Sequence, residues 1–184
     1  MTGTEDLRSE HVGVSRMLHI MDSMAGYARR GEGPAPEDVE QAVEFLRVFV
    51  DKCHHTKEEE LLFPAIRAAN IASAEDTIVV LLADHAQGRE TVARIAAAAQ
   101  HLSADGVPAN TEFAEAIASY TELLHQHIRR EESECFDVAN RELSEAVQAE
   151  LVTGYDRIER EVVGGGVHEA FHAMLDRLGQ VYRA

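Results

Sequence analysis

Apolar residues recur at helical spacing through most of this chain, and this periodicity is the strongest constraint on its fold. No stretch alternates between apolar and polar residues over the length of a strand. Breaks rich in glycine, proline or small residues delimit six predicted helices. These are expected at residues 4–29, 37–69, 75–102, 110–139, 143–162 and 167–182. The sequence therefore predicts an all-α protein.

Length and connections suggest how these helices assemble. A chain of 184 residues that is 45% apolar can build one core without disulfides or other staples. Long helices joined by short connections favour an up-down-up-down four-helix bundle, whose interior is a usual place for a metal site. We expect that bundle over residues 4–139. Residues 140–184 are expected to form a C-terminal helical extension that packs on it.

Charge and composition exclude several classes of function. The chain has 33 Asp and Glu against 17 Lys and Arg, a net charge of −16, which would repel nucleic acid. It has neither a leader-like N-terminus nor an apolar run long enough to cross a membrane. A cytoplasmic location without membrane contact is therefore expected. Cys53 and Cys135 fit no zinc or disulfide framework and are predicted to be reduced thiols in the core.

The chain contains an internal repeat. The segment HHTKEEELLFPAI (54–66) aligns without gaps on HIRREESECFDVA (127–139), at an offset of 73 residues. Both begin with histidine, place glutamates four and five positions later, and then share a phenylalanine. Upstream, SEHVGVSRML (9–18) aligns on ADHAQGRETV (83–92) at an offset of 74 residues, which pairs His11 with His85. Each half of the bundle thus carries one histidine followed by one HxxxE motif.

The repeated residues form a pattern typical of metal ligands. Positions four apart lie on one face of a helix, so His54 with Glu58 and His127 with Glu131 form two chelating pairs. Apolar residues continue both faces, so these pairs should point into the core. Burying two glutamates without a cation would cost several kcal/mol each. A pair of metal ions is the simplest partner, and this donor set suits iron, manganese or zinc.

Each element of the pattern also has a structural explanation. A lone core histidine is more often a hydrogen-bonded structural residue, and one HxxxE pair is often a surface ion pair. Metal binding is favoured only because the histidine and the HxxxE motif both occur twice, at matching positions of the repeat. The flanking residues are predicted to be solvated helix edges rather than groups that orient the ligands. This prediction covers His55, Glu59, Glu60 and Glu132.

A second histidine motif is not interpreted as a zinc site. The segment HEAFH (168–172) matches the HExxH pattern of zinc metalloproteases. Such a protease also needs a third ligand and a substrate cleft with an edge strand, and an all-helical chain offers no strand. The alternative is a helix that packs apolar residues on the bundle, namely Phe171, Met174, Leu175 and Leu178.

The pattern H, HxxxE, H, HxxxE, with HHxxEEExLFP, resembles the hemerythrin-like (HHE cation-binding) family over about residues 4–139. The resemblance implies two non-heme iron ions with an oxo or hydroxo bridge. It implies bridging roles for Glu58 and Glu131 and no catalytic residues beyond the metal ligands. The terminal ligands that it implies are His11, His54, His85 and His127.

One departure from the family affects the expected function. Its oxygen carriers use a fifth histidine four residues after the first on the third helix, and Arg89 stands there. Arginine has no lone pair to donate, so both ions should keep an open position unless Tyr120 or a C-terminal residue reaches in. This favours an oxidoreductase that decomposes hydrogen peroxide or reacts with nitric oxide or oxygen. The alternative is oxygen binding, or iron or oxygen sensing, without turnover. The sequence does not indicate the oligomeric state.

Overall fold

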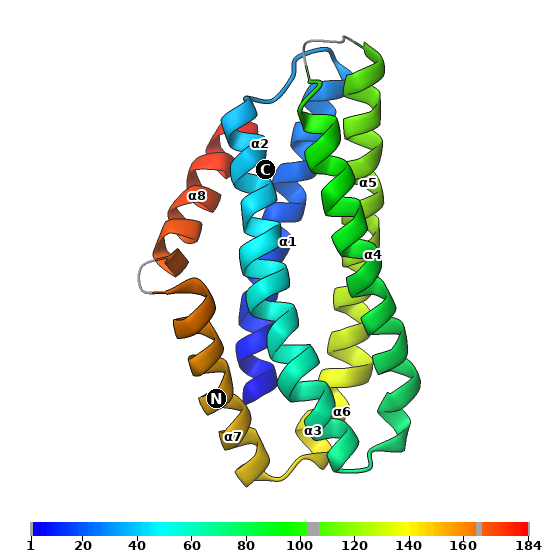
Figure 1. Cartoon of the computed structure of the whole chain (residues 1–184), viewed down its shortest axis with the longest axis vertical. Coiled ribbons are helices and arrows are strands. Elements are labelled where there is room, and N and C mark those ends of the chain that lie inside the picture. Colours follow the sequence, from blue (N-terminus) through cyan, green and yellow to red (C-terminus); the bar gives the residue numbers. More distant parts are fainter. Residues whose placement is uncertain (1, 103–106, 165–166, 184) are drawn as a thin grey trace.

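The computed structural model describes residues 2–102, 107–164 and 167–183, and all regular elements in these ranges are helical. Four rods run up, down, up and down (Figure 1), which confirms the predicted helical bundle. The first rod is α1 (Gly3–Arg29). The second consists of α2 (Pro36–Phe45), η1 (Leu46–His55), η2 (Glu58–Leu62) and α3 (Phe63–Ala68). After the short turn η3 (Ala72–Ala74), the third is α4 (Glu75–Ala99). The fourth consists of α5 (Val107–Arg130), η4 (Glu131–Phe136) and α6 (Asp137–Glu142).

Local sequence explains where the rods begin and end. The Thr2 hydroxyl accepts a hydrogen bond from the Glu5 amide, and the Glu5 carboxylate accepts one from the Thr2 amide, which closes a capping box on α1. The fourth rod differs from prediction at both ends, because it begins at Val107 and continues to Glu142. Pro108 lies in the first turn of α5, where a missing N–H is tolerated, so the helix begins before this proline rather than after it.

Several segments have the wider π-helical turn, in which the amide bonds to the carbonyl five residues back. Three of these segments, η1, η2 and η4, contain four of the seven donors of the two buried groups described below. A wider turn rotates successive side chains through a smaller angle. Adjacent residues such as His54 and His55 can therefore face the interior together.

The core has two apolar parts separated by a polar layer. One cluster includes Val14, Val50, Val92 and Leu124, and the other includes Leu7, Leu62, Leu81 and Cys135. Along each rod, the predicted metal ligands lie between a residue of the first cluster and a residue of the second. The polar layer is thus enclosed by apolar side chains at both ends.

Three further segments follow the bundle: α7 (Glu145–Ile158), η5 (Glu159–Val163) and α8 (Val167–Tyr182). They run beside α1 and the second rod, at the left of Figure 1. The Gln148 carboxamide accepts a hydrogen bond from the Gly3 amide at 3.1 Å and donates one to the Ala139 carbonyl at 3.2 Å. The apolar face of α8 packs inward, with Leu175 and Leu178 buried.

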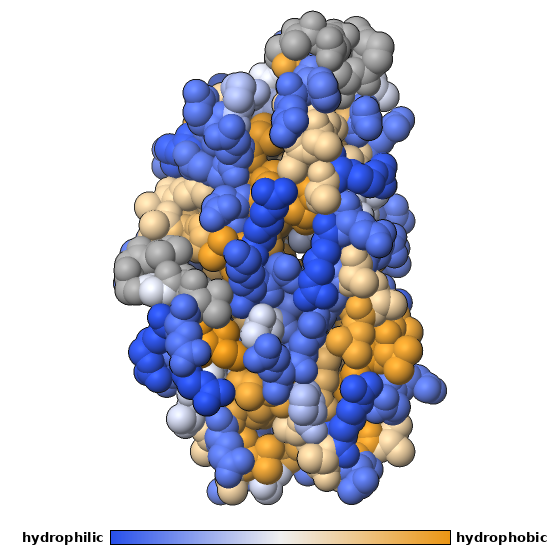
Figure 2. All heavy atoms as spheres, in the orientation of Figure 1, coloured by the Kyte–Doolittle hydropathy of each residue, from blue (hydrophilic) through white to orange (hydrophobic). Residues whose placement is uncertain are grey.

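Hydrophilic side chains cover much of the face shown in Figure 2, with apolar patches between them. Among the described residues, no helix is both long and apolar enough to cross a membrane.

Candidate metal centre

The six predicted ligands come together between the two apolar clusters, and all six are buried. The Nε2 atoms of His11 and His54 lie 3.1 Å apart. Glu58 lies between two histidines, with Oε1 3.2 Å from His54 Nε2 and Oε2 3.3 Å from His85 Nε2. Glu131 Oε2 lies 3.3 Å from His11 Nε2 and 3.5 Å from His127 Nε2. Each carboxylate therefore touches one histidine from each half of the repeat.

The donors form two groups that share Glu58, and in each group the candidate ligand atoms lie within 4.8 Å of one another. The first group, called group A, contains His11, His54, Glu58 and Glu131. The second, called group B, contains His55, Glu58, His85 and His127. The sequence predicted every member except His55.

The unsatisfied polar atoms of the centre fit bound cations. Both carboxylate oxygens of Glu58 and Glu131 are buried without a hydrogen-bond partner, as are the Nε2 atoms of His85 and His127. Their contacts with each other at 3.2–3.5 Å do not have hydrogen-bond geometry. Buried carboxylates are almost always hydrogen-bonded or paired, because burying them otherwise is costly. Cations bound among the donors of the two groups would give these oxygen and nitrogen atoms a partner.

A carboxylate outside the groups faces the Nδ1 atom of each predicted histidine. This contact favours the Nδ1–H tautomer and turns the Nε2 lone pair inward, as a metal ligand requires. The pairs are His11 with Glu132 at 2.9 Å, His54 with Glu10 at 2.7 Å, His85 with Glu59 at 2.8 Å and His127 with Asp84 at 3.4 Å.

Each of these outer carboxylates also contacts a basic side chain. The basic residues are Arg8 on Glu132, Lys57 on Glu10, Arg89 on Glu59 and Arg130 on Asp84. Lys57 is the most buried of them, and its ammonium also donates to Asp6 and Glu159. This ammonium donates to all three members of the acidic cluster formed by Asp6, Glu10 and Glu159, so the protein itself supplies a cation there.

The electrostatics of the centre show which groups compensate each other. Burial opposes charge on His54, but the Glu58 carboxylate and the hydrogen bond to Glu10 hold the His54 pKa well above its usual range. Burial also opposes protonation of His85, but the adjacent Glu58 carboxylate and the hydrogen bond to Glu59 raise its pKa to about 9. Burial disfavours the Glu58 carboxylate, yet His54 and His85 hold its pKa well below the usual value. Without a cation, protons on His54 and His85 compensate the Glu58 charge, whereas burial and the neighbouring Glu58 carboxylate raise the pKa of Glu131.

His55 differs from the other histidines of the centre. It is buried, and neither ring nitrogen has a hydrogen-bond partner. Its ring stacks on that of His85, with centroids 3.8 Å apart. Burial and the neighbouring His85 lower its pKa to about 3, so the ring is neutral. The prediction of a solvated edge is wrong for His55.

That prediction is also wrong for Glu59 and Glu132, which bond to His85 and His11. It is correct for Glu60, which is exposed. The outer carboxylates also follow the internal repeat of the sequence. An acidic residue precedes the lone histidine in both halves, at Glu10 and Asp84, and a second glutamate follows each HxxxE motif.

The remaining predicted residues lie outside the donor groups. Arg89 donates to Asp51 and Glu59 at 2.7 Å and is partly exposed. Cys53 and Cys135 are free, buried thiols, as predicted, and burial raises the pKa of Cys53 to about 12. In the HEAFH motif, His172 is exposed on α8, and the side chain of His168 lies outside the described residues.

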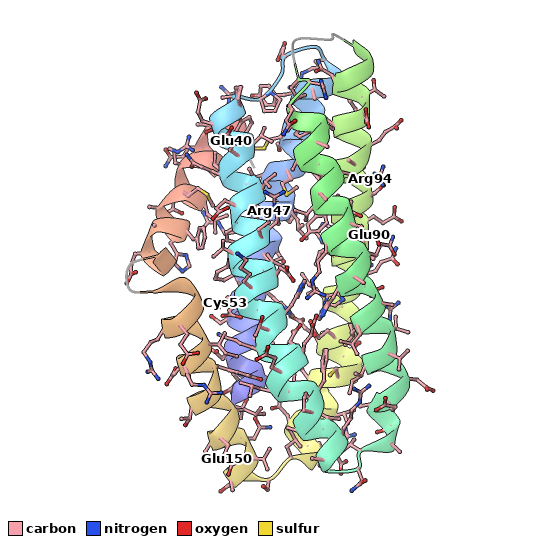
Figure 3. All side chains as sticks on the ribbon, viewed as in Figure 1. Glu40, Arg47, Cys53, Glu90, Arg94 and Glu150 are labelled. Carbon is pink, nitrogen blue, oxygen red and sulfur yellow. The ribbon has the colours of Figure 1, made fainter. Side chains whose placement is uncertain are left out.

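A cavity of about 260 Å³ adjoins group B. Its walls come from η1, α4 and α5, and they include His55, Asp51, Arg89 and Tyr120. Arg47, labelled in Figure 3, lies on the side of the second rod that faces α4 and also lines this cavity. The cavity gives small molecules space beside the buried donors.

A helical bundle that encloses histidines and shared carboxylates is a cation-binding bundle by its architecture. The family model for the hemerythrin HHE cation-binding domain matches residues 2–139. The chain therefore belongs to this family. Neither a curated protein sequence nor a solved structure gave a significant match.

Proposed function

We propose that this chain binds two iron ions, one at group A and one at group B. Glu58 and Glu131 would bridge them, and His11, His54, His85 and His127 would be the terminal ligands. The single observation that supports this most directly is the position of Glu58. Its two oxygens face histidines of different groups, 3.2 Å and 3.3 Å away, and neither oxygen has a hydrogen-bond partner. A bridging carboxylate would have this arrangement.

We further propose that the iron pair reacts with small oxidants, decomposing hydrogen peroxide or reacting with nitric oxide or oxygen. An oxo- or hydroxo-bridged iron pair supplies the redox chemistry and open coordination positions that such molecules need. The protein residues hold the donors in place, because the outer carboxylates fix the imidazole orientations. The two apolar clusters exclude bulk water from the centre, and the cavity between η1 and α4 admits only small molecules.

Oxygen binding without turnover is the second candidate function. His55 favours it, because this additional buried histidine adjoins group B, where it could limit access to one ion. An iron pair with a single open position is suited to binding a ligand and releasing it unchanged.

Metal analysis followed by a peroxide assay tests the proposal. Protein loaded anaerobically with ferrous iron should retain two irons per chain after gel filtration. On exposure to peroxide it should release oxygen faster than an equal amount of free ferric iron. His172→Ala is a matched control, because it removes an exposed histidine away from the donor groups. Retention of one iron or none would contradict the iron pair. Two irons with reversible oxygen uptake and no peroxide loss would favour the second candidate.

A further inference from the structure

His55 is a member of group B whose counterpart in the internal repeat has a different chemical character. At an offset of 73 residues, His54 pairs with His127, Lys57 with Arg130, Glu58 with Glu131 and Glu59 with Glu132. Each of these pairs joins residues of the same chemical type and the same role in the structure. The counterpart of His55, however, is Ile128. Group B therefore has a histidine where the corresponding position of the other half has an aliphatic side chain.

No hydrogen bond from the described residues compensates the burial of the His55 ring nitrogens. Leaving a polar group buried without a partner is energetically unfavourable. Both ring nitrogens of His55 are in that situation, and one of them lies within 4.8 Å of the donors of Glu58, His85 and His127. A structural histidine in a core would be expected to donate or accept at least one hydrogen bond.

The surroundings of His55 resemble those of the other four histidines. Its Nδ1 atom faces the Asp51 carboxylate at 3.5 Å, and Asp51 in turn accepts a hydrogen bond from Arg89 at 2.7 Å. The histidine thus contacts a carboxylate, which in turn contacts a basic side chain, as for the other four histidines. The contact between His55 and Asp51 is, however, longer than a hydrogen bond. With Nδ1 turned toward Asp51, Nε2 is the nitrogen left to face the donors of group B.

We infer that His55 is a third histidine ligand of the ion at group B. The inference rests on the proposed iron pair and adds a residue to it. It differs from the expectation that both ions keep an open position. The ion at group B would have three histidines and two bridging carboxylates, whereas the ion at group A would have two histidines and the same bridges. The second rod would thus supply the histidine that α4 lacks at Arg89, and the two irons would be inequivalent.

The alternative is that His55 forms only a wall of the cavity. Two variants separate these roles. His55→Ala removes the imidazole, and Tyr120→Phe alters another wall residue of the same cavity without removing a nitrogen donor. Mössbauer spectra of protein loaded with ⁵⁷Fe report the surroundings of each iron separately, whatever the activity.

For the wild type and Tyr120→Phe we expect two distinct quadrupole doublets of equal area. In His55→Ala one doublet should shift toward the other or be lost, and azide should bind at two positions per iron pair instead of one. Added imidazole should restore the wild-type spectrum, because the cavity leads to the vacated position. His55→Gln is the second variant should His55→Ala fail to fold, and it should show the same shift of one doublet.

Unchanged doublets in His55→Ala, or a change that imidazole does not reverse, would overturn the inference. An unchanged spectrum in a folded His55→Gln protein that binds two irons would do the same. These results leave the proposed iron pair standing, because it is judged by the metal content of the wild type. Absence of two irons in the wild type would instead reject both.

Discussion

Replacing Lys57 with methionine should destabilise the metal-free protein strongly, although the Lys57 ammonium pairs with carboxylates that are not predicted metal ligands. The Lys57 side chain is 0% exposed, and its ammonium donates to Glu10 at 2.6 Å, Glu159 at 2.5 Å and Asp6 at 3.1 Å. Methionine retains an unbranched apolar side chain but removes the positive charge. Glu10 would then be buried beside two other carboxylates, with the hydrogen bond from His54 Nδ1 as its remaining partner.

The magnitude follows from the exposure of the three acids. Removing one partner of a buried ion pair costs about 3–5 kcal/mol, because the other charge is left uncompensated. The side chains of Asp6 and Glu159 are 25% and 33% exposed, so water can solvate them, whereas that of Glu10 is 5% exposed. The cost should therefore come mainly from Glu10 and lie near the lower limit, about 3 kcal/mol.

The repeat provides a matched control. Arg130 is the counterpart of Lys57 and contacts Asp84 at 3.0 Å, but its side chain is 31% exposed. Partly exposed ion pairs contribute about 0–1 kcal/mol, so Arg130→Met should cost no more than about 1 kcal/mol. Urea unfolding of the metal-free proteins, followed by circular dichroism, measures both values.

Adding Glu10→Gln to Lys57→Met should recover part of the loss, because it removes the uncompensated charge. Equal destabilisation by Lys57→Met and Arg130→Met would refute the reasoning. So would a Lys57→Met protein that is as stable as the wild type, since the buried ammonium would then contribute nothing.

Two further predictions concern the metal ligands. Glu58→Ala and Glu131→Ala should each lose bound iron and lower the unfolding temperature of the loaded protein, because each removes a proposed bridge. Full iron content in both variants would show that neither carboxylate is a bridge. Stability should also depend on pH in the metal-free protein. The pKa of His85 rises on folding from its usual 6.5 to about 9, so the bound proton stabilises the fold fully below about pH 6.5, and this contribution is lost as the pH rises through about 9. Thermal unfolding across this range should show a falling midpoint for the metal-free protein and a nearly constant one for the loaded protein, and parallel curves would contradict the prediction.

Local patterns predicted the fold and much of the candidate site. The helices follow from apolar periodicity, and the six predicted donors follow from spacings of four residues and their repetition. Both signals lie within single helices. The structure brings His11, His54 and Glu131 from three different rods into one group.

The residues that sequence reasoning misplaced depend on contacts between rods. Lys57 lies in the charged run KEEE, which is typical of a solvated helix, yet Glu159, 102 positions later, helps to bury it. His55 turns inward at the end of a π-helical segment, and an i, i+4 pattern contains no sign of that wider turn. Neither position could be placed without knowing which surfaces of the rods meet.

The polar layer between the two apolar clusters has a consequence for cooperativity. Each cluster can bury its own side chains, so the two ends of the bundle are joined mainly by rods that pass through a layer of unsatisfied donors. Amide hydrogen exchange in such a protein can reveal separate opening units. Bound cations would tie all four rods together at mid-height, so the two ends would open as one unit in the loaded protein and separately in the metal-free protein.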